Sequence, residues 1–218
     1  MKTEFVVGGL DLASVSSGVT YVRGTWNGST VKLEPLIEKA FRIENSFPSR
    51  YEHARKMLQL SCSVRDEYGL DLCAIEDYTM QIASMVSFSM GEFGGIVRAF
   101  HYASGFPILL NKPQIMRSFI ADARKIPKGA AGKRSIIEWC GEDFSYESVQ
   151  TYAKERSDCS DAFVHACLGI YTLLFLEGVP LSILSEKRQM TWKNHKKSGI
   201  LDQLDVRLLY PRKRAVAE

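Results

Sequence analysis

Short apolar runs and alternating apolar and polar positions predict β-strands at the start of the chain. Residues 5–11 form an apolar run that suits a central strand buried on both faces. A second strand is expected over residues 18–23, and Asn27-Gly28 behind it is a strong hairpin signal. Alternation over residues 31–41 predicts a third strand. Three consecutive antiparallel strands should therefore open the fold.

Helical periodicity then alternates with two further apolar runs. Helices are expected where apolar residues recur every three to four positions, and strands where a short apolar run lies between turn signals. The expected helices cover residues 49–68, 87–103, 113–121, 132–139 and 157–177, and the expected strands cover 72–76 and 107–110. Gly91, Gly94 and Gly95 cost the second helix roughly 1 kcal/mol each relative to alanine. They indicate that the backbone of another element approaches closely there.

This order of elements predicts an α/β fold with a mixed five-stranded sheet flanked by helices. The first strands are linked by hairpins and the later ones by helical crossovers, so antiparallel and parallel neighbours are both expected. The last helix has little polar surface and should lie inside the core. We expect one domain over residues 1–181 and a basic C-terminal extension over residues 182–218.

Composition is that of an ordinary globular protein, with 45% apolar residues in a chain of 218. No apolar run reaches the ~18 residues that suggest a membrane span. The sequence shows no signal-peptide pattern, so we expect a cytoplasmic protein (in the host cytoplasm if the source is viral) with no membrane partner. Five cysteines without a Cys-x-x-Cys pair predict reduced, mostly buried thiols.

The net charge of +3 is unevenly distributed. Residues 182–218 contain nine Lys and Arg and four acids, a balance of +5, which leaves −2 for the rest of the chain. A basic extension on a near-neutral domain is typical of polyanion binding, although a solvated tail without a partner fits the composition equally well. Within the extension, Trp192 lies among lysines, a mixture that suits base stacking beside phosphate contacts.

Four carboxylates lie where metal-dependent chemistry needs them. Asp11 and Glu76 each end an apolar strand, and ligands of open α/β sheets bind at that end of the strands. Asp158 and Asp161 share one face near the start of the last helix, where Asp can also simply stabilise a helix N-terminus. Together the four form an oxygen-donor set that suits two Mg²⁺ or Mn²⁺ ions, an arrangement that hydrolyses phosphodiesters.

Three segments around these acids carry a resemblance to a known family. They read GLDLAS with SGV at residues 9–14 and 17–19, AIE at 74–76, and SDCSDA at 157–162. In order and spacing they resemble the first strand, the second acidic strand and the D-x-x-D-A helix start of RuvC-like Holliday junction resolvases, phage-type members included, in the RNase H-like nuclease superfamily. The resemblance covers about residues 4–178.

This resemblance implies an RNase H-like fold and a homodimer that binds a four-way DNA junction and makes paired, symmetric nicks. By position, Asp11 would bridge two divalent ions, Glu76 and Asp161 would complete their coordination, and Asp158 would be a further ligand. The implied enzyme is a crossover junction endodeoxyribonuclease that uses Mg²⁺ or Mn²⁺, two ions per active site. Its cleavage would be hydrolysis of phosphodiesters in branched DNA.

Basic and aromatic residues near the acids are candidates for contacting DNA. Lys133 and Arg134 match the basic stretch by which the resembled family contacts phosphates. The family often has an aromatic wedge after its second acid, and Tyr78 is the candidate here. A basic loop precedes Lys133 and would bind phosphate in a salt-dependent way. The predicted DNA-binding set is Arg124, Lys125, Lys128, Lys133, Arg134 and Tyr78.

Other interpretations remain open at this point. An RNase H-type nuclease acting on RNA–DNA hybrids would use the same carboxylates. An actin-like or sugar-kinase-like ATPase would need a glycine two positions after Asp11, where this chain has Ala13. A non-catalytic junction-binding protein is opposed by the four intact acids. His165, one turn after Asp161, could face the metal site, although histidines on apolar helices are more often core residues.

Overall fold

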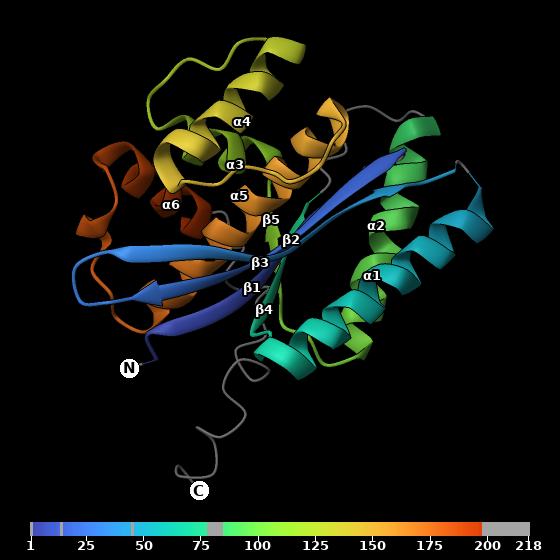
Figure 1. The fold of residues 1–218 in the computed structure, drawn as a ribbon, viewed down its shortest axis with the longest axis horizontal. Coiled ribbons are helices and arrows are strands. Elements are labelled where there is room, and N and C mark those ends of the chain that lie inside the picture. Colours follow the sequence, from blue (N-terminus) through green and yellow to red (C-terminus); the bar gives the residue numbers. More distant parts are fainter. Residues whose placement is uncertain (1, 14, 45, 78–84, 198–218) are drawn as a thin grey trace, which may run out of the picture.

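The computed structural model describes residues 2–13, 15–44, 46–77 and 85–197, which fold around one mixed five-stranded sheet (Figure 1). The strands are β1 (Glu4–Asp11), β2 (Ser16–Trp26), β3 (Val31–Arg42), β4 (Leu72–Glu76) and β5 (Ile108–Asn111). The helices are α1 (Phe47–Tyr68), α2 (Met85–Ala103), α3 (Pro113–Ala121), α4 (Ala130–Phe144), α5 (Ala153–Leu176) and α6 (Glu186–Lys197), with a 3-10 turn η1 (Leu181–Ile183).

The sheet has the order β3-β2-β1-β4-β5. Its first three strands form two antiparallel pairs, and β4 and β5 run parallel to β1 after helical crossovers. The predicted α/β fold with a mixed five-stranded sheet is confirmed. In register, Leu10 lies beside Ile75 and Glu76 beside Asn111, so the C-terminal ends of β1, β4 and β5 finish at the same edge.

Helices cover both faces of this sheet and produce two separate cores (Figure 1). Helices α1 and α2 lie on one face and bury a cluster that includes Leu10, Met57 and Phe93. Helix α5 lies on the other face, where α3, α4 and α6 pack around it and bury residues such as Phe119 and Phe163. The strands are apolar on both faces because both faces are covered.

Glycines let α5 lie directly on the backbone of the sheet. A Cβ at Gly9 would lie 1.8 Å from the carbonyl oxygen of Ala162, and one at Gly18 would lie 2.1 Å from that of Asp158. Either contact is far shorter than real Cβ atoms make, so any larger residue would push the helix away. The sequence around β1 and β2 therefore fixes how deeply α5 sits, and with it the position of its acids.

Helix boundaries differ from the prediction at both ends of the site. Helix α5 begins at Ala153 rather than at residue 157, and the acid in its first turn is Glu155. Asp158 and Asp161 lie beyond that turn, so stabilisation of a helix N-terminus does not account for them. Helix α4 covers Ala130–Phe144, so part of the basic stretch predicted as a loop is helical.

The extension predicted to start at residue 182 contains a helix that packs on the core. Trp192 of α6 is only 6% exposed, and its ring lies 4.8 Å from that of Phe175 in an edge-to-face arrangement. Its indole nitrogen donates to the hydroxyl of Thr172 over 3.4 Å. The prediction that Trp192 stacks on bases is therefore wrong, because the side chain is already buried. Residues 198–218 lie outside the described residues.

Two smaller expectations concern glycines and cysteines. No described atom lies within 4 Å of a Cβ built on Gly91 or Gly95, so the predicted close approach to α2 at these positions is wrong. All five cysteines are free, and four of them are buried, as the sequence predicted.

Among the described residues, α5 alone is long and apolar enough to suit a membrane span, and 89% of its apolar window is buried inside the protein.

Candidate active site

Two acids meet at the ends of neighbouring parallel strands. Because Leu10 and Ile75 are paired in register, the residues that follow them, Asp11 and Glu76, emerge side by side at the edge of the sheet. Their side chains share a hydrogen bond. Burial raises the pKa of Asp11 well above its ordinary value, and the charge of Glu76 raises this pKa further.

Helix α5 brings two more acids to the same place. Burial raises the pKa of Asp161 well above its ordinary value, and the neighbouring charge of Asp11 adds to the effect. Burial also raises the pKa of Asp158, although the hydroxyl of Ser16, which donates a hydrogen bond to it, opposes the shift. The structure thus brings together all four acids that the sequence singled out.

Two cations partly compensate this cluster. The ammonium of Lys133 on α4 lies 3.8 Å from Asp158 Oδ1 and lowers the pKa of all four acids. The guanidinium of Arg117 on α3 lowers the pKa of Glu76 and Asp161. Lys133 belongs to the predicted set, whereas Arg117 was missed. The one available signal was that α3 starts directly after β5, at the same edge of the sheet.

The chemistry of the donor set fits a divalent cation. Asp161 Oδ1 is buried and has no hydrogen-bond partner, and carboxylates held close together are stabilised when a cation compensates their charge. Within the described residues, no three His, Cys, Asp or Glu side chains are already grouped as ligands of one ion. Asp11 is engaged with Glu76, and Asp158 with Ser16, so these contacts would have to be exchanged for contacts to the metal.

The other predicted DNA-binding residues are placed differently. Lys125, Lys128 and Arg134 have exposed side chains. Arg124 is half-buried: it forms ion pairs with Glu142 and Asp143 and lies over the ring of Trp139, so its charge is already compensated. Tyr78 falls outside the described residues.

His165 is fully buried, as its position on an apolar helix suggested. Burial, together with the nearby His195 of α6, lowers its pKa to about 3. Neither ring nitrogen has a hydrogen-bond partner among the described residues. Its backbone oxygen accepts a hydrogen bond from the side chain of Asn111 over 3.4 Å. The core interpretation of His165 is therefore confirmed, but its ring is not satisfied by hydrogen bonds.

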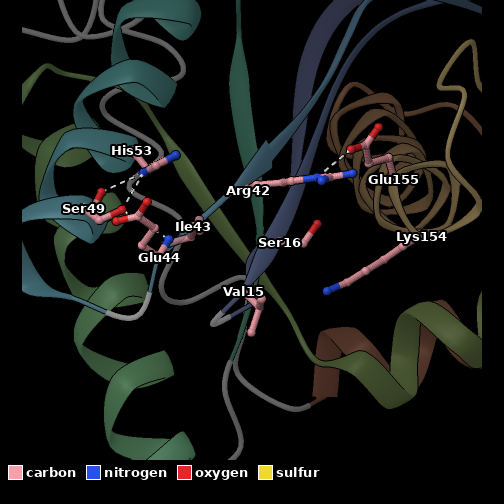
Figure 2. A pocket seen from close by; sticks show the side chains of 9 residues that line it. All are labelled: Val15, Ser16, Arg42, Ile43, Glu44, Ser49, His53, Lys154 and Glu155. Atoms are coloured by element: carbon pink, nitrogen blue, oxygen red, sulfur yellow. Dashed lines mark hydrogen bonds and ion pairs between the residues drawn. The ribbon is translucent and has the colours of Figure 1, made fainter.

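Two hollows flank the carboxylate cluster at the N-terminal end of α5. The first, of about 550 Å³, lies between α5, the ends of β2 and β3, and α1. Figure 2 shows Lys154 extending from α5 into this hollow towards Ser16, while Arg42 forms an ion pair with Glu155 (3.1 Å). The second hollow, of about 770 Å³, lies between α4 and the start of α5. Lys154 lines both.

Comparison of the sequence with protein-family models and with curated proteins gives no match. Solved structures do match. Thermus thermophilus RuvC is similar with a TM-score of 0.59 and 16% identity, over 78% of this chain and 97% of that chain. T. thermophilus RuvC in complex with Holliday junction substrate is similar with a TM-score of 0.57 and 15% identity, over 80% of this chain and 97% of that chain.

A third structure, the Fowlpox virus resolvase with substrate Holliday junction DNA, matches with a TM-score of 0.48 and 11% identity, over 78% of this chain and 99% of that chain. At these identities, the two Thermus matches establish the fold. The chain has the RNase H-like fold of RuvC, and the predicted fold resemblance is confirmed.

Proposed function

We propose that this chain, which has the RuvC fold, is a metal-dependent endonuclease that resolves four-way DNA junctions by paired nicks. The observation that carries this proposal is the convergence of Asp11, Glu76, Asp158 and Asp161 at one edge of the sheet, from two strands and one helix. Asp11 and Asp161 each interact electrostatically with the other three acids. Such a cluster, with a buried unpartnered carboxylate oxygen, is matched to divalent cations.

Each part of the site has a role in this mechanism. Two divalent ions held by the four acids would supply an activated water and stabilise the leaving 3′ oxygen. The close packing of α5 on Gly9 and Gly18 holds Asp158 and Asp161 against the strand-end acids. Lys133, whose ammonium lies 3.8 Å from Asp158 Oδ1, would attract the phosphate to be cut and compensate its charge.

Paired nicks require two active sites, and we propose that they come from a homodimer. Exposed aromatic side chains on α1 and α2 are the candidate contact surface: Phe47, Tyr51 and Tyr102 are 54%, 45% and 60% exposed. Figure 1 places these two helices together on the face of the sheet opposite α5. Phe47 and Tyr51 lie next to each other, with 6.4 Å between their ring centroids, and neighbouring exposed aromatic side chains of this kind are typical of protein interfaces.

The test is cleavage of a labelled synthetic four-way junction, an RNA–DNA hybrid and a linear duplex, with Mg²⁺ and with EDTA. We expect Mg²⁺-dependent, paired, symmetric nicks in the junction. Asp11→Asn and Glu76→Gln should lower the cleavage rate by at least about a thousandfold, because each removes a metal ligand. Binding to the junction in EDTA should remain.

Glu34→Gln is the matched control, because it removes an exposed carboxylate at the far end of β3. Undiminished cutting by either active-site variant would refute the site. Cutting of the hybrid in preference to the junction would favour the RNase H-type alternative. An ATPase is not supported, because one sheet accounts for all strands in the described part of the chain and two lobes are absent there.

A further inference from the structure

The hollow between α4 and α5, which we call the α4–α5 groove, opens beside the carboxylate cluster. Its volume is about 770 Å³, and Lys133 and Ser157 line it. Ser157 precedes Asp158 in the chain, and the ammonium of Lys133 lies 3.8 Å from Asp158 Oδ1. A chain-like ligand lying in this groove would therefore pass next to residues that adjoin Asp158.

The side chains of the groove give it a positive charge. Four cations and two acids line it: Lys133, Arg134, Lys154 and Arg156 against Glu138 and Glu147. Three of these cations, Arg134, Lys154 and Arg156, are exposed and form no ion pair among the described residues. Arg124, in the segment before α4, and Arg188 of α6 are by contrast tied to Asp143. The groove thus holds cations that remain available to an anionic ligand.

The wall opposite α4 is held in place before any ligand binds. Tyr146 donates a hydrogen bond to Glu38 of β3 over 2.7 Å, and Ser148 donates to the same carboxylate over 2.5 Å. The ring of Tyr146 also stacks on Phe163 of α5, with 3.9 Å between the centroids. These contacts fix the segment between α4 and α5, so the groove needs little ordering when it is filled.

The path continues past the acids. Lys154 lines the α4–α5 groove and also the smaller hollow drawn in Figure 2, in which its side chain extends towards Ser16. Ser16, which lines this second hollow, donates a hydrogen bond to Asp158. Asp158 is therefore in contact with a residue that lines each hollow, Ser16 in one and Lys133 in the other, and Lys154 lines both.

We propose that the α4–α5 groove binds the phosphodiester backbone of one DNA strand, with Lys154 and Arg156 contacting phosphates next to the one held at the acids. The proposal deepens the proposed function and rests on it. A volume of about 770 Å³ lies in the range of small-ligand sites, roughly 300–1,000 Å³, so it has room for a short stretch of one strand. Phosphate contacts by lysine and arginine position a strand without reading its sequence.

The experiment compares two double variants of the full chain that remove the same charge. Lys154→Gln/Arg156→Gln changes the groove, and Lys32→Gln/Lys56→Gln changes exposed cations on β3 and α1. Lys32 lies in register with Thr25, at the end of the sheet away from the acids. Binding of a fluorescein-labelled single-stranded oligonucleotide and of a labelled four-way junction is measured by anisotropy in EDTA over a range of salt concentrations. Thermal melts check folding.

We expect the groove variant to bind both probes about tenfold more weakly. Affinity falls as salt rises, and the plot of log affinity against log salt should become less steep by about 2, one unit for each lost phosphate contact. The control variant should bind like the wild type. Equal weakening in both variants, or none in either, would overturn the proposal. These binding measurements need no metal, so they test the groove even if the wild type proves unable to cut DNA. Failure to cut would reject only the proposed endonuclease activity.

Discussion

At the scale of single residues, the carboxylate cluster opposes folding as long as no cation occupies it. Burial raises the pKa of Asp11, Glu76 and Asp161, and mutual repulsion raises it further, which means that their charged forms are disfavoured in the folded state. Lys133 and Arg117 offset only part of this effect. Strain of this kind, kept at a site for the sake of activity, is a common reason why a protein is less stable than it could be.

Asp161→Asn should therefore stabilise the metal-free protein. Without divalent ions the melting temperature at neutral pH is expected to rise by about 2–4 °C, equivalent to roughly 1 kcal/mol in a chain of this size. Saturating Mg²⁺ should raise the melting temperature of the wild type more than that of the variant. Differential scanning fluorimetry in EDTA and in Mg²⁺ measures both. If Asp161→Asn melts lower than the wild type in EDTA, the acids do not repel one another as inferred.

The residues of the site were predictable to different degrees. Asp11 and Glu76 could be found because each ends a short apolar strand, and sequence order alone places parallel strand ends together. Ser16 and Arg117 could not, because their relation to the acids depends on how β2 pairs and how α3 is oriented. Neither residue type is unusual in a turn or on a helix. Tertiary contacts, which carry no local signal, decide both.

At the scale of elements, the depth at which α5 lies on the sheet is the feature on which the site depends. A Cβ at Gly18 would lie 2.1 Å from the carbonyl oxygen of Asp158, a backbone atom that cannot move without moving the helix. At Gly91 of α2, by contrast, a Cβ would meet no described atom within 4 Å outside the backbone of its own helix. The same substitution should therefore have opposite effects at these two positions.

Gly18→Ala is expected to destabilise the protein by at least about 1–3 kcal/mol, because overpacking forces the backbone to shift. It should also weaken Mg²⁺-dependent cleavage by displacing Asp158. Gly91→Ala should instead stabilise by up to about 1 kcal/mol, since alanine is the better helix former and has open space there. Urea unfolding of both variants gives the two free energies. A Gly18→Ala protein as stable as the wild type would show that α5 is not held against β2.

Helix α6 shows why one element escaped the sequence prediction. Its buried side chains, Thr191, Trp192 and His195, form a narrow stripe on a helix whose other positions are mostly charged or polar. Such a stripe is too thin to stand out as an amphipathic pattern, and the charge excess suggested an extension that either binds a polyanion or is simply solvated. Packing of Trp192 against Phe175 and the ion pairs of Arg188 with Asp122 and Asp143 override that local signal.

At the scale of the whole molecule, most of the basic charge of the C-terminal region lies on helix α6. Helix α6 contains five Lys and Arg and one acid, whereas residues 198–218 contain four Lys and Arg and three acids. Most of the excess of +5 therefore lies on α6, which packs on the core. One of the five, Arg188, is tied up in ion pairs. Any polyanion contact by this region should come chiefly from Lys187, Lys193, Lys196 and Lys197 on α6.

Two truncations separate these contributions. Removing residues 198–218 should shift the salt slope of junction binding by less than about 1, because little net charge is lost. Removing residues 186–218 takes away Trp192 and Arg188, and loss of a buried Trp alone costs about 3–5 kcal/mol. The melting temperature should then fall by roughly 10 °C. Should the shorter deletion flatten the salt slope as much as the longer one, residues 198–218 and not α6 would hold the polyanion contact.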